Sequence, residues 1–201
     1  MILYPPLKKA SYFGWFHELK SLGDFNKCIT QRFGENPQVY GPKGHNGIDI
    51  ACPNGTEIFA SHDGECSYYE ELDEFGNFKG YGRYLVVRDR NNGFKTEYCH
   101  LDKVVKTGLV KVGELIGHSD NTGFSSGPHL HWTLKVGDAV DPLPHLVWFN
   151  TMTEQEVKNI YKLAFYRLPD ASELAFWVGK NLDTFLTTAI TDRANFLNQP
   201  L

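Results

Sequence analysis

The chain has 201 residues, enough for one sizeable domain or for one domain with a small appendage. Its apolar fraction of 41% and its charged fraction of 22% are ordinary for a globular protein. The formal net charge of −4 at pH 7 argues against a nucleic-acid partner, which needs a basic face, and gives no support to docking on anionic membranes.

The amino-terminal segment MILYPPLKKASYFGWF does not have the pattern of a signal peptide. It lacks a basic start followed by an apolar run, and Pro5 and Pro6 interrupt its few apolar residues. No stretch reaches the roughly 20 apolar residues that a membrane helix needs, so we expect no membrane insertion. We expect the protein to be made in the cytoplasm. A secreted protein whose leader lies outside this sequence is the alternative.

The chain begins with a lead-in segment and continues as short strands. Residues 1–27 are rich in aromatic side chains and have no clear period, which predicts a packed segment rather than a domain. From residue 28 to residue 148, short apolar runs alternate with turn residues. The sequence Asn91-Asn92-Gly93 predicts a hairpin, because Asn and Gly tolerate the positive φ of such turns.

Two later segments extend the strand pattern. KTGLVKVGELIG, residues 106–117, predicts two short strands separated by glycines. LHWTLKV, residues 130–136, alternates between apolar and polar side chains and ends at Gly137. The middle of the chain is therefore predicted to be mainly β, with an antiparallel sheet as its core.

The sequence changes period in residues 149–201. Thr153 and Glu156 have the spacing of a capping box, and Asp170 and Glu173 repeat it at the start of the next helix. A third amphipathic stretch follows, so we expect a small three-helix domain here. The fold class predicted for the whole chain is α+β, a mainly β core with a small C-terminal α-helical domain.

The cysteines are predicted to be buried free thiols, because no two of them form a C-x-x-C pair and all lie in apolar surroundings. They are Cys28, Cys52, Cys66 and Cys99.

The motifs GHNGIDI and SSGPHLHW supply candidate metal ligands. His45 and Asp49 are four residues apart, and Gly47 between them allows the backbone to turn sharply. His129 and His131 share one face of a strand, because successive side chains alternate. Two neutral imidazoles and one carboxylate, from His45, His131 and Asp49, are the ligand chemistry of a catalytic zinc that keeps a fourth position for water. Such a centre retains a charge of about +1 and its Lewis acidity.

Hydrolysis also needs groups that accept and donate protons. His129 lies on the face of His131, and His100 ends the predicted strand FKTEYCHL, so both are candidates. The other histidines are expected to be structural or merely exposed: His17, His62, His118 and His145. Tyr40 could offer a hydroxyl to an oxyanion, but a packed aromatic is the favoured interpretation.

The segments GHNGIDI, EYCHL and TGFSSGPHLHW together resemble the lysostaphin-type (LytM-like) zinc endopeptidases, which cut peptide cross-links of bacterial peptidoglycan. The resemblance extends over residues 29–144. It implies one zinc ion on His45, Asp49 and His131, with His100 and His129 polarising the water and steadying the transition state. It also implies that bacterial peptidoglycan is the substrate, and it leaves open whether a glycine bridge or a bond involving D-alanine is cut.

Three alternatives compete with this interpretation. The chain could be a LytM-like binding or activator module that has lost its metal, although all five matching positions are present. The glycine-punctuated residues 106–117 resemble biotinyl and lipoyl carrier domains, but the sequence has no lysine where a carrier would display one. A virion structural protein with an incidental enzyme domain is the third.

A wall-cutting enzyme made in the cytoplasm needs a route to the wall. We therefore expect a phage lysin that acts at the cell wall after lysis, after release through a holin-like pore, or aboard a phage tail. The C-terminal segment around FYRLPD is similar to a small helical module of bacterial surface proteins. It could dock to the wall or to a phage tail partner.

Overall fold

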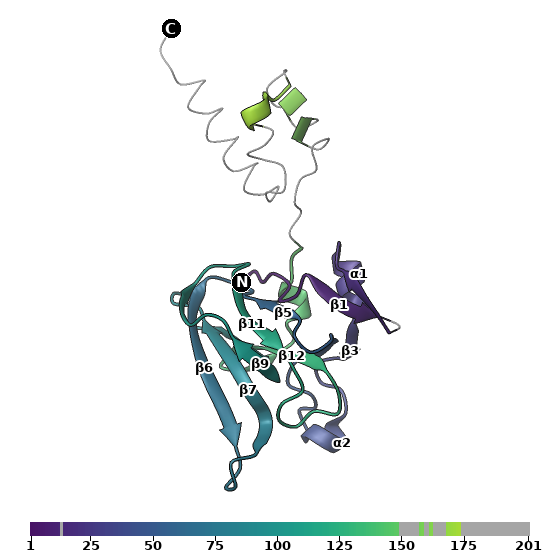
Figure 1. Cartoon of the computed structure of the whole chain (residues 1–201), viewed down its shortest axis with the longest axis vertical. Coiled ribbons are helices and arrows are strands. Elements are labelled where there is room, and N and C mark those ends of the chain that lie inside the picture. The colour runs from purple at the N-terminus through teal and green to yellow at the C-terminus, as the bar shows by residue number, and fades with distance from the viewer. Residues whose placement is uncertain (13, 149–156, 159–160, 163–167, 174–201) are drawn as a thin grey trace. The chain divides into compact units, whose positions relative to one another are not determined.

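The computed structural model describes residues 1–12, 14–148, 157–158, 161–162 and 168–173 (Figure 1). The chain separates into two compact units, residues 1–148 and residues 149–201. Among the described residues, no helix combines the length and the apolar character needed to cross a membrane.

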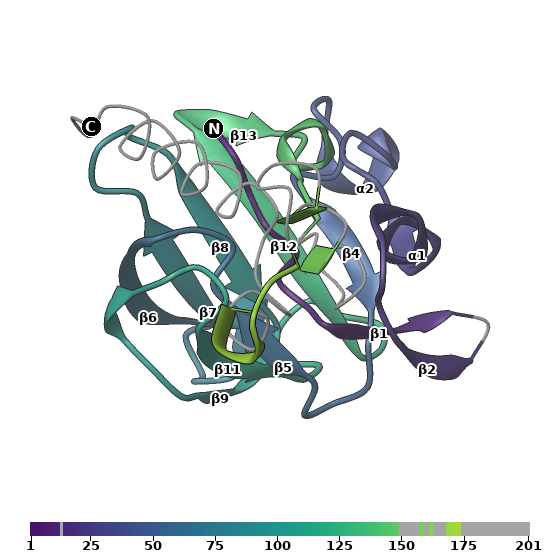
Figure 2. The ribbon, with the colours of Figure 1, turned by 90° about the horizontal axis from the view of Figure 1, so that it is seen from above.

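The first unit is built on one large antiparallel sheet, whose strands β6, β7, β8, β12 and β4 lie side by side in Figure 2. The full strand order is β10-β6-β7-β8-β12-β4-β3, and β13 pairs with β12. These strands are β3 (Ile29–Gln31), β4 (Ile48–Ala51), β6 (Gly64–Leu72), β7 (Phe78–Arg88), β8 (Lys95–Cys99), β10 (Gly108–Val110), β12 (His129–Val136) and β13 (Asp138–Val140). The predicted mainly antiparallel β fold is confirmed.

A second sheet of three strands covers one face of the large sheet. Its order is β5-β11-β9, with β5 at Glu57–Phe59, β11 at Leu115–Ser119 and β9 at Leu101–Val104. Gly117 of β11 approaches β7 so closely that a Cβ added there would lie 3.3 Å from Leu85 Cδ1. Burial of apolar side chains between the two sheets supplies the main driving force for this arrangement.

Alternation along the central strands separates a core face from a polar face. Tyr98 of β8 and Trp132 of β12 are fully buried in the hydrophobic core. Their neighbours Glu97, His131 and Thr133 therefore point to the opposite face, because successive side chains of a strand alternate. The candidate site lies on this polar face.

The predicted turns and strands in this unit are confirmed. β7 and β8 form a hairpin with Arg88 opposite Lys95, and Gly93 in its turn has a φ of +71°. Residues 106–117 contribute β10 and β11, and β12 ends just before Gly137, whose φ is +73°. The four cysteines are free and buried, as expected.

The lead-in segment contains more regular structure than its sequence pattern predicts. It folds into the hairpin β1–β2, at Lys9–Tyr12 and Trp15–Glu18, and the helix α1, at Leu22–Lys27. Ser21 caps α1 by accepting a hydrogen bond from the Asp24 amide. Leu3, Leu7 and Phe25 are buried in the same core as the sheets.

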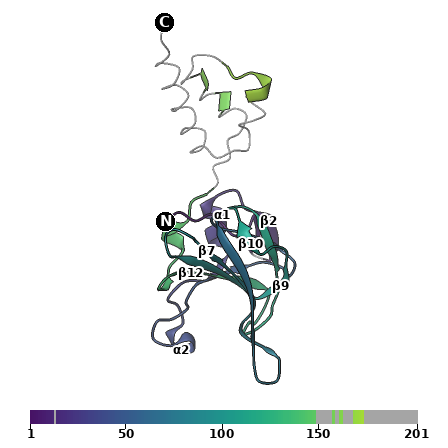
Figure 3. The same cartoon turned by 90° about the vertical axis from the view of Figure 1, so that its left-hand side faces the viewer.

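Two short helical elements complete this unit. They are α2 at Pro37–Tyr40 and the 3₁₀ helix η1 at Leu143–His145. Figures 1 and 3 show α2 at the same end of the unit as the tip of the β6–β7 hairpin.

The described part of the C-terminal unit confirms one predicted helix start. Asp170 Oδ1 accepts a hydrogen bond of 2.9 Å from the Glu173 amide, and Glu173 Oε2 accepts one of 2.9 Å from the Asp170 amide. This is the reciprocal pattern of a capping box. The predicted Thr153–Glu156 box and the third amphipathic stretch lie outside the described residues.

Candidate active site

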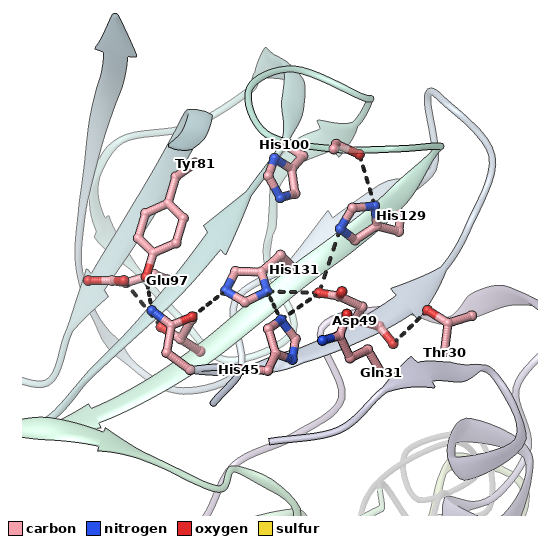
Figure 4. A network of polar contacts seen from close by, with 12 residues as sticks. Thr30, Gln31, His45, Asp49, Tyr81, Glu97, His100, His129 and His131 are labelled. Carbon is pink, nitrogen blue, oxygen red and sulfur yellow. Dashed lines mark hydrogen bonds and ion pairs between the residues drawn. The ribbon is translucent and has the colours of Figure 1, made fainter. Parts of the chain in front are cut away.

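The register of two paired strands brings the motif residues together. Asp49 of β4 is directly opposite His131 of β12, and His129 lies two residues before His131 on the same face. His45 lies in the loop that leads into β4, and His100 follows β8 (Figure 4). All five predicted residues therefore lie in one cluster.

His45, Asp49 and His131 form a compact set of ligand atoms. His45 Nε2 lies 2.9 Å from His131 Nδ1 and 3.2 Å from Asp49 Oδ1, and the His131 Nδ1–Asp49 Oδ1 distance is 2.8 Å. Ligand atoms that coordinate an ion tetrahedrally at about 2.0–2.2 Å from it would lie about 3.3–3.6 Å from one another. The three atoms can therefore hold a metal ion after small outward shifts.

The hydrogen bonds of the outer nitrogens of His45 and His131 determine which ring nitrogens carry protons. His45 Nδ1 lies 3.2 Å from the Arg32 carbonyl oxygen, and His131 Nε2 lies 3.1 Å from Asn46 Oδ1. Both oxygens only accept hydrogen bonds, so the outer nitrogens carry the protons and the inner ones are bare. Two bare nitrogens and a carboxylate thus converge without a donor, which is the environment that a divalent ion neutralises.

The three candidate ligands are buried, and burial keeps His131 in the neutral form that binds a metal. His45, Asp49 and His131 are 2%, 8% and 4% exposed. Burial lowers the pKa of His131 despite the neighbouring Asp49, so the imidazole is neutral.

The two non-ligand histidines are held by backbone oxygens. His100 Nδ1 donates to the Thr122 carbonyl at 2.6 Å, and His129 Nδ1 donates to the Gly127 carbonyl at 2.7 Å. The Nε2 atom of each ring is thereby left free to accept a proton. The two ring centroids are 4.7 Å apart, and His129 Nε2 lies 3.6 Å from Asp49 Oδ1.

His100 is fixed in a neutral, strained position. Its φ of +62° is unusual for a residue other than glycine, and its amide donates to the Tyr81 carbonyl at 3.0 Å. Burial and the nearby His129 lower the pKa of His100 to about 4. At neutral pH this imidazole is therefore uncharged.

Close backbone contacts position the loops around the cluster. A Cβ on Gly47 would lie 2.6 Å from the Trp132 carbonyl oxygen, so glycine lets this loop pack directly against β12. The predicted sharp turn is confirmed, because the backbone bends at Asn46 and Gly47, although Gly47 does not need a positive φ for it. Gly123 has a φ of +81°, and a Cβ there would lie 2.4 Å from the Gly82 amide nitrogen. Glycine at this position therefore lets the loop before β12 pass close to β7.

The cluster opens into a cleft of about 520 Å³. Val39 and Tyr40 of α2 line it, as does Phe124 of the loop before β12. These side chains are 58%, 41% and 70% exposed. The expectation of a packed Tyr40 is therefore wrong: its ring faces the cleft, 5.1 Å from the His45 ring.

Sequence reasoning did not find the residues that orient the site. Asn46 lies inside the GHNGIDI motif, where a polar side chain between two ligands could have suggested a supporting role. Tyr81 and Thr122 gave no such signal. The other four histidines do not join the metal-ligand group found among the described residues. Of these, His62 is buried beside Phe94 and Thr96.

The sequence profile of peptidase family M23 matches residues 43–142, which include all five site residues. The chain is 40% identical over 119 residues to the DD-carboxypeptidase/endopeptidase Mpg of Neisseria meningitidis, a match covering 57% of this chain and 26% of that protein. It is 42% identical over 94 residues to the peptidoglycan DD-endopeptidase ShyA of Vibrio cholerae, covering 46% of this chain and 20% of ShyA. The chain thus matches about a quarter or less of the length of these relatives.

A solved structure agrees with the sequence matches. The structure of LytU is 35% identical to this chain, with a TM-score of 0.50, and the match covers 58% of this chain and 82% of LytU. The profile match, this structural similarity and the convergent His-Asp-His group point to the same conclusion. The chain belongs to peptidase family M23 and has the LytM-like metallopeptidase fold.

Proposed function

We propose that the protein is a zinc-dependent endopeptidase that hydrolyses peptide cross-links or stems of bacterial peptidoglycan. The observation that carries this proposal is the convergence of His45 Nε2, His131 Nδ1 and Asp49 Oδ1 at the base of an open cleft. The names of the relatives Mpg and ShyA support peptidoglycan as the substrate.

The donor set favours zinc. Two neutral imidazoles and one carboxylate are a usual set for catalytic zinc sites, whereas magnesium and calcium prefer all-oxygen ligands. When bound, zinc would supply a Lewis acid for the scissile carbonyl and lower the pKa of a water molecule to about 7.

His100 and His129 supply the proton transfers. Each has its Nδ1 proton fixed by a backbone carbonyl, so each keeps a free Nε2, and both rings line the cleft. One imidazole can take a proton from the attacking water, and an imidazole must return a proton to the departing amine. Tyr40, exposed on the wall of the cleft, can reach a substrate with its hydroxyl.

The relatives favour one class of bond. Mpg and ShyA are both named for activity on DD bonds, which join two D-amino acids. We therefore propose that this chain cuts a D-alanine-containing cross-link rather than a glycine bridge.

Digestion of purified sacculi tests both parts of the proposal. One wall type should be directly cross-linked and the other glycine-bridged, each incubated with the protein with and without a chelator, and the products identified by mass spectrometry. We expect new amino termini at the D-alanine cross-link of the first type only, and none with chelator. Chelator-resistant cleavage would contradict the metal centre, and cleavage confined to glycine bridges would contradict the bond assignment.

The route to the wall and the partner of residues 149–201 stay predictions. Delivery after lysis, through a holin-like pore or on a phage tail is consistent with a wall hydrolase, as is secretion. Fractionation of infected or growing cells with an antibody to the full chain would distinguish these routes.

A further inference from the structure

His131 contacts a polar side chain that neither binds the metal nor transfers a proton. Its Nε2 lies 3.1 Å from Asn46 Oδ1, and Asn46 Nδ2 donates to the Tyr81 hydroxyl at 2.5 Å. The Tyr81 ring also stacks against the His131 ring, with centroids 5.5 Å apart and planes inclined by 30° (Figure 4). His131 is thus held through its ring face and through its outer nitrogen.

An amide side chain offers different groups at its two ends. The oxygen only accepts hydrogen bonds, and the nitrogen only donates them. With its nitrogen on the Tyr81 hydroxyl, Asn46 turns its oxygen toward His131. His131 then carries its proton on Nε2 and points a bare Nδ1 at Asp49 and His45.

The backbone next to Asn46 makes this contact possible. Gly47 lets the loop lie against β12, where a Cβ would be 2.6 Å from the Trp132 carbonyl oxygen. Asn46 is therefore placed beside His131 by a close approach that a larger residue at position 47 would prevent. Tyr81 comes from β7, 35 positions further along the chain.

We propose that Asn46, oriented by the Tyr81 hydroxyl, is a positioning residue that fixes the tautomer and ring orientation of His131 for metal binding. This inference rests on the proposed function, because it assumes that His131 ligates a metal. Partners of the outer nitrogen of a ligating histidine commonly change metal affinity by about 10–100-fold.

Zinc affinity of the full chain tests the inference without relying on activity. The protein is stripped with a chelator and titrated with zinc against a competing chromophoric chelator. We expect Asn46→Leu, which keeps the approximate size but removes the acceptor, to weaken zinc binding about 10–100-fold. Asn46→Asp keeps an acceptor oxygen and should bind zinc at least as tightly as the wild type. Tyr81→Phe should show a smaller loss than Asn46→Leu, because the amide is then free to rotate.

A matched control variant and an NMR signal distinguish a positioning role of Asn46 from a role in packing alone. Tyr84→Phe removes a hydroxyl from a neighbouring ring that contacts Tyr81 edge to face, and it should leave the zinc affinity unchanged. In the zinc-loaded wild type, the His131 Nε2 proton should give a protected NMR signal that is lost in Asn46→Leu.

Each remaining outcome has a definite meaning. The inference would be overturned if Asn46→Leu bound zinc as tightly as the wild type. It would also be overturned if Asn46→Asp lost as much zinc affinity as Asn46→Leu, because this would indicate that Asn46 acts through packing alone. A wild-type chain that binds no zinc would instead overturn the proposed function. If Asn46→Leu does not fold, as judged by its thermal transition, the zinc affinities of Tyr81→Phe and Tyr84→Phe are compared instead. Weaker binding in Tyr81→Phe alone supports the inference, and equal binding in the two variants overturns it.

Discussion

Asp49 and His131 face each other across the β4–β12 ladder, with Asp49 Oδ1 2.8 Å from His131 Nδ1. Two of the three candidate metal ligands are therefore fixed by the register of a central strand pair rather than by a loop. A shift of either strand by one residue would turn the candidate ligand of that strand to the core face. The stability of the sheet and the integrity of the metal site are coupled through this pair.

Loss of a ligand should therefore remove the metal. We expect His131→Ala to bind no zinc under conditions in which the wild type binds one equivalent, because only two protein ligands remain. Elemental analysis of the purified proteins measures this directly. His17→Ala changes an exposed histidine outside the cluster and should keep one equivalent. Stoichiometric zinc in His131→Ala would contradict the ligand assignment.

A non-ligand histidine should affect the rate and leave the metal in place. His129→Ala should retain zinc and lose about 10²–10⁴ in the rate of cross-link hydrolysis, since it removes a proton-transfer group. Release of soluble fragments from sacculi, together with the zinc content of the same sample, provides both measurements. Hydrolysis at the wild-type rate would show that His129 has no part in the reaction.

The fold should lose stability below neutral pH because of His62. This side chain is buried, and burial lowers its pKa in the folded state. In the unfolded chain the pKa is about 6.5. As the pH falls below this value, the unfolded state binds a proton that the folded state does not, so the free energy of unfolding decreases until the pH passes the folded pKa.

Comparison of His62→Gln with the wild type isolates this contribution. Urea unfolding at several pH values from about 7.5 to about 5, a range that spans the pKa of the unfolded state, gives the free energy of unfolding of each protein. The wild type should lose more stability than His62→Gln on acidification. His17→Gln, at an exposed position, should have the same pH dependence as the wild type. If the free energy of unfolding fell equally with pH in His62→Gln and in the wild type, His62 would not be the cause of the loss.

Gly47 should tolerate no side chain. In Gly47→Ala the new Cβ would meet the Trp132 carbonyl oxygen at 2.6 Å and His131 Cε1 at 2.9 Å. We expect a loss of about 1–3 kcal/mol in the free energy of unfolding, as for other overpacked sites, and weaker zinc binding because His131 must move. Gly23→Ala in α1 is the control, since its nearest neighbour would lie at 3.4 Å. Equal stability and zinc affinity of both variants would contradict the close approach.

Much of the site could be predicted because its residues are local to each other in the sequence. His129 and His131 needed only strand alternation, and His45 and Asp49 only their spacing, to be recognised as possible partners. The meeting of the two pairs depends on strand register, and the resemblance to a known family supplied that step.

Other features could not be predicted because they depend on contacts between distant segments. The nitrogen that His131 presents to a metal is set by Asn46 and Tyr81, which lie on different elements. The strands of the β1–β2 hairpin have four residues each, too few for a period to emerge from the sequence. The orientation of Tyr40 depends on which side of α2 faces the cleft, and its sequence neighbours do not reveal this.

The ends of the first unit are joined to each other. The Leu3 amide donates to the His145 carbonyl at 2.9 Å, and the Val147 amide donates to the Leu3 carbonyl at 2.8 Å. A unit whose first and last segments lie together can be inserted into a host chain at one place without stretching either connection. The proximity of Leu3 and Val147 makes circular permutation of residues 1–148 a feasible engineering route.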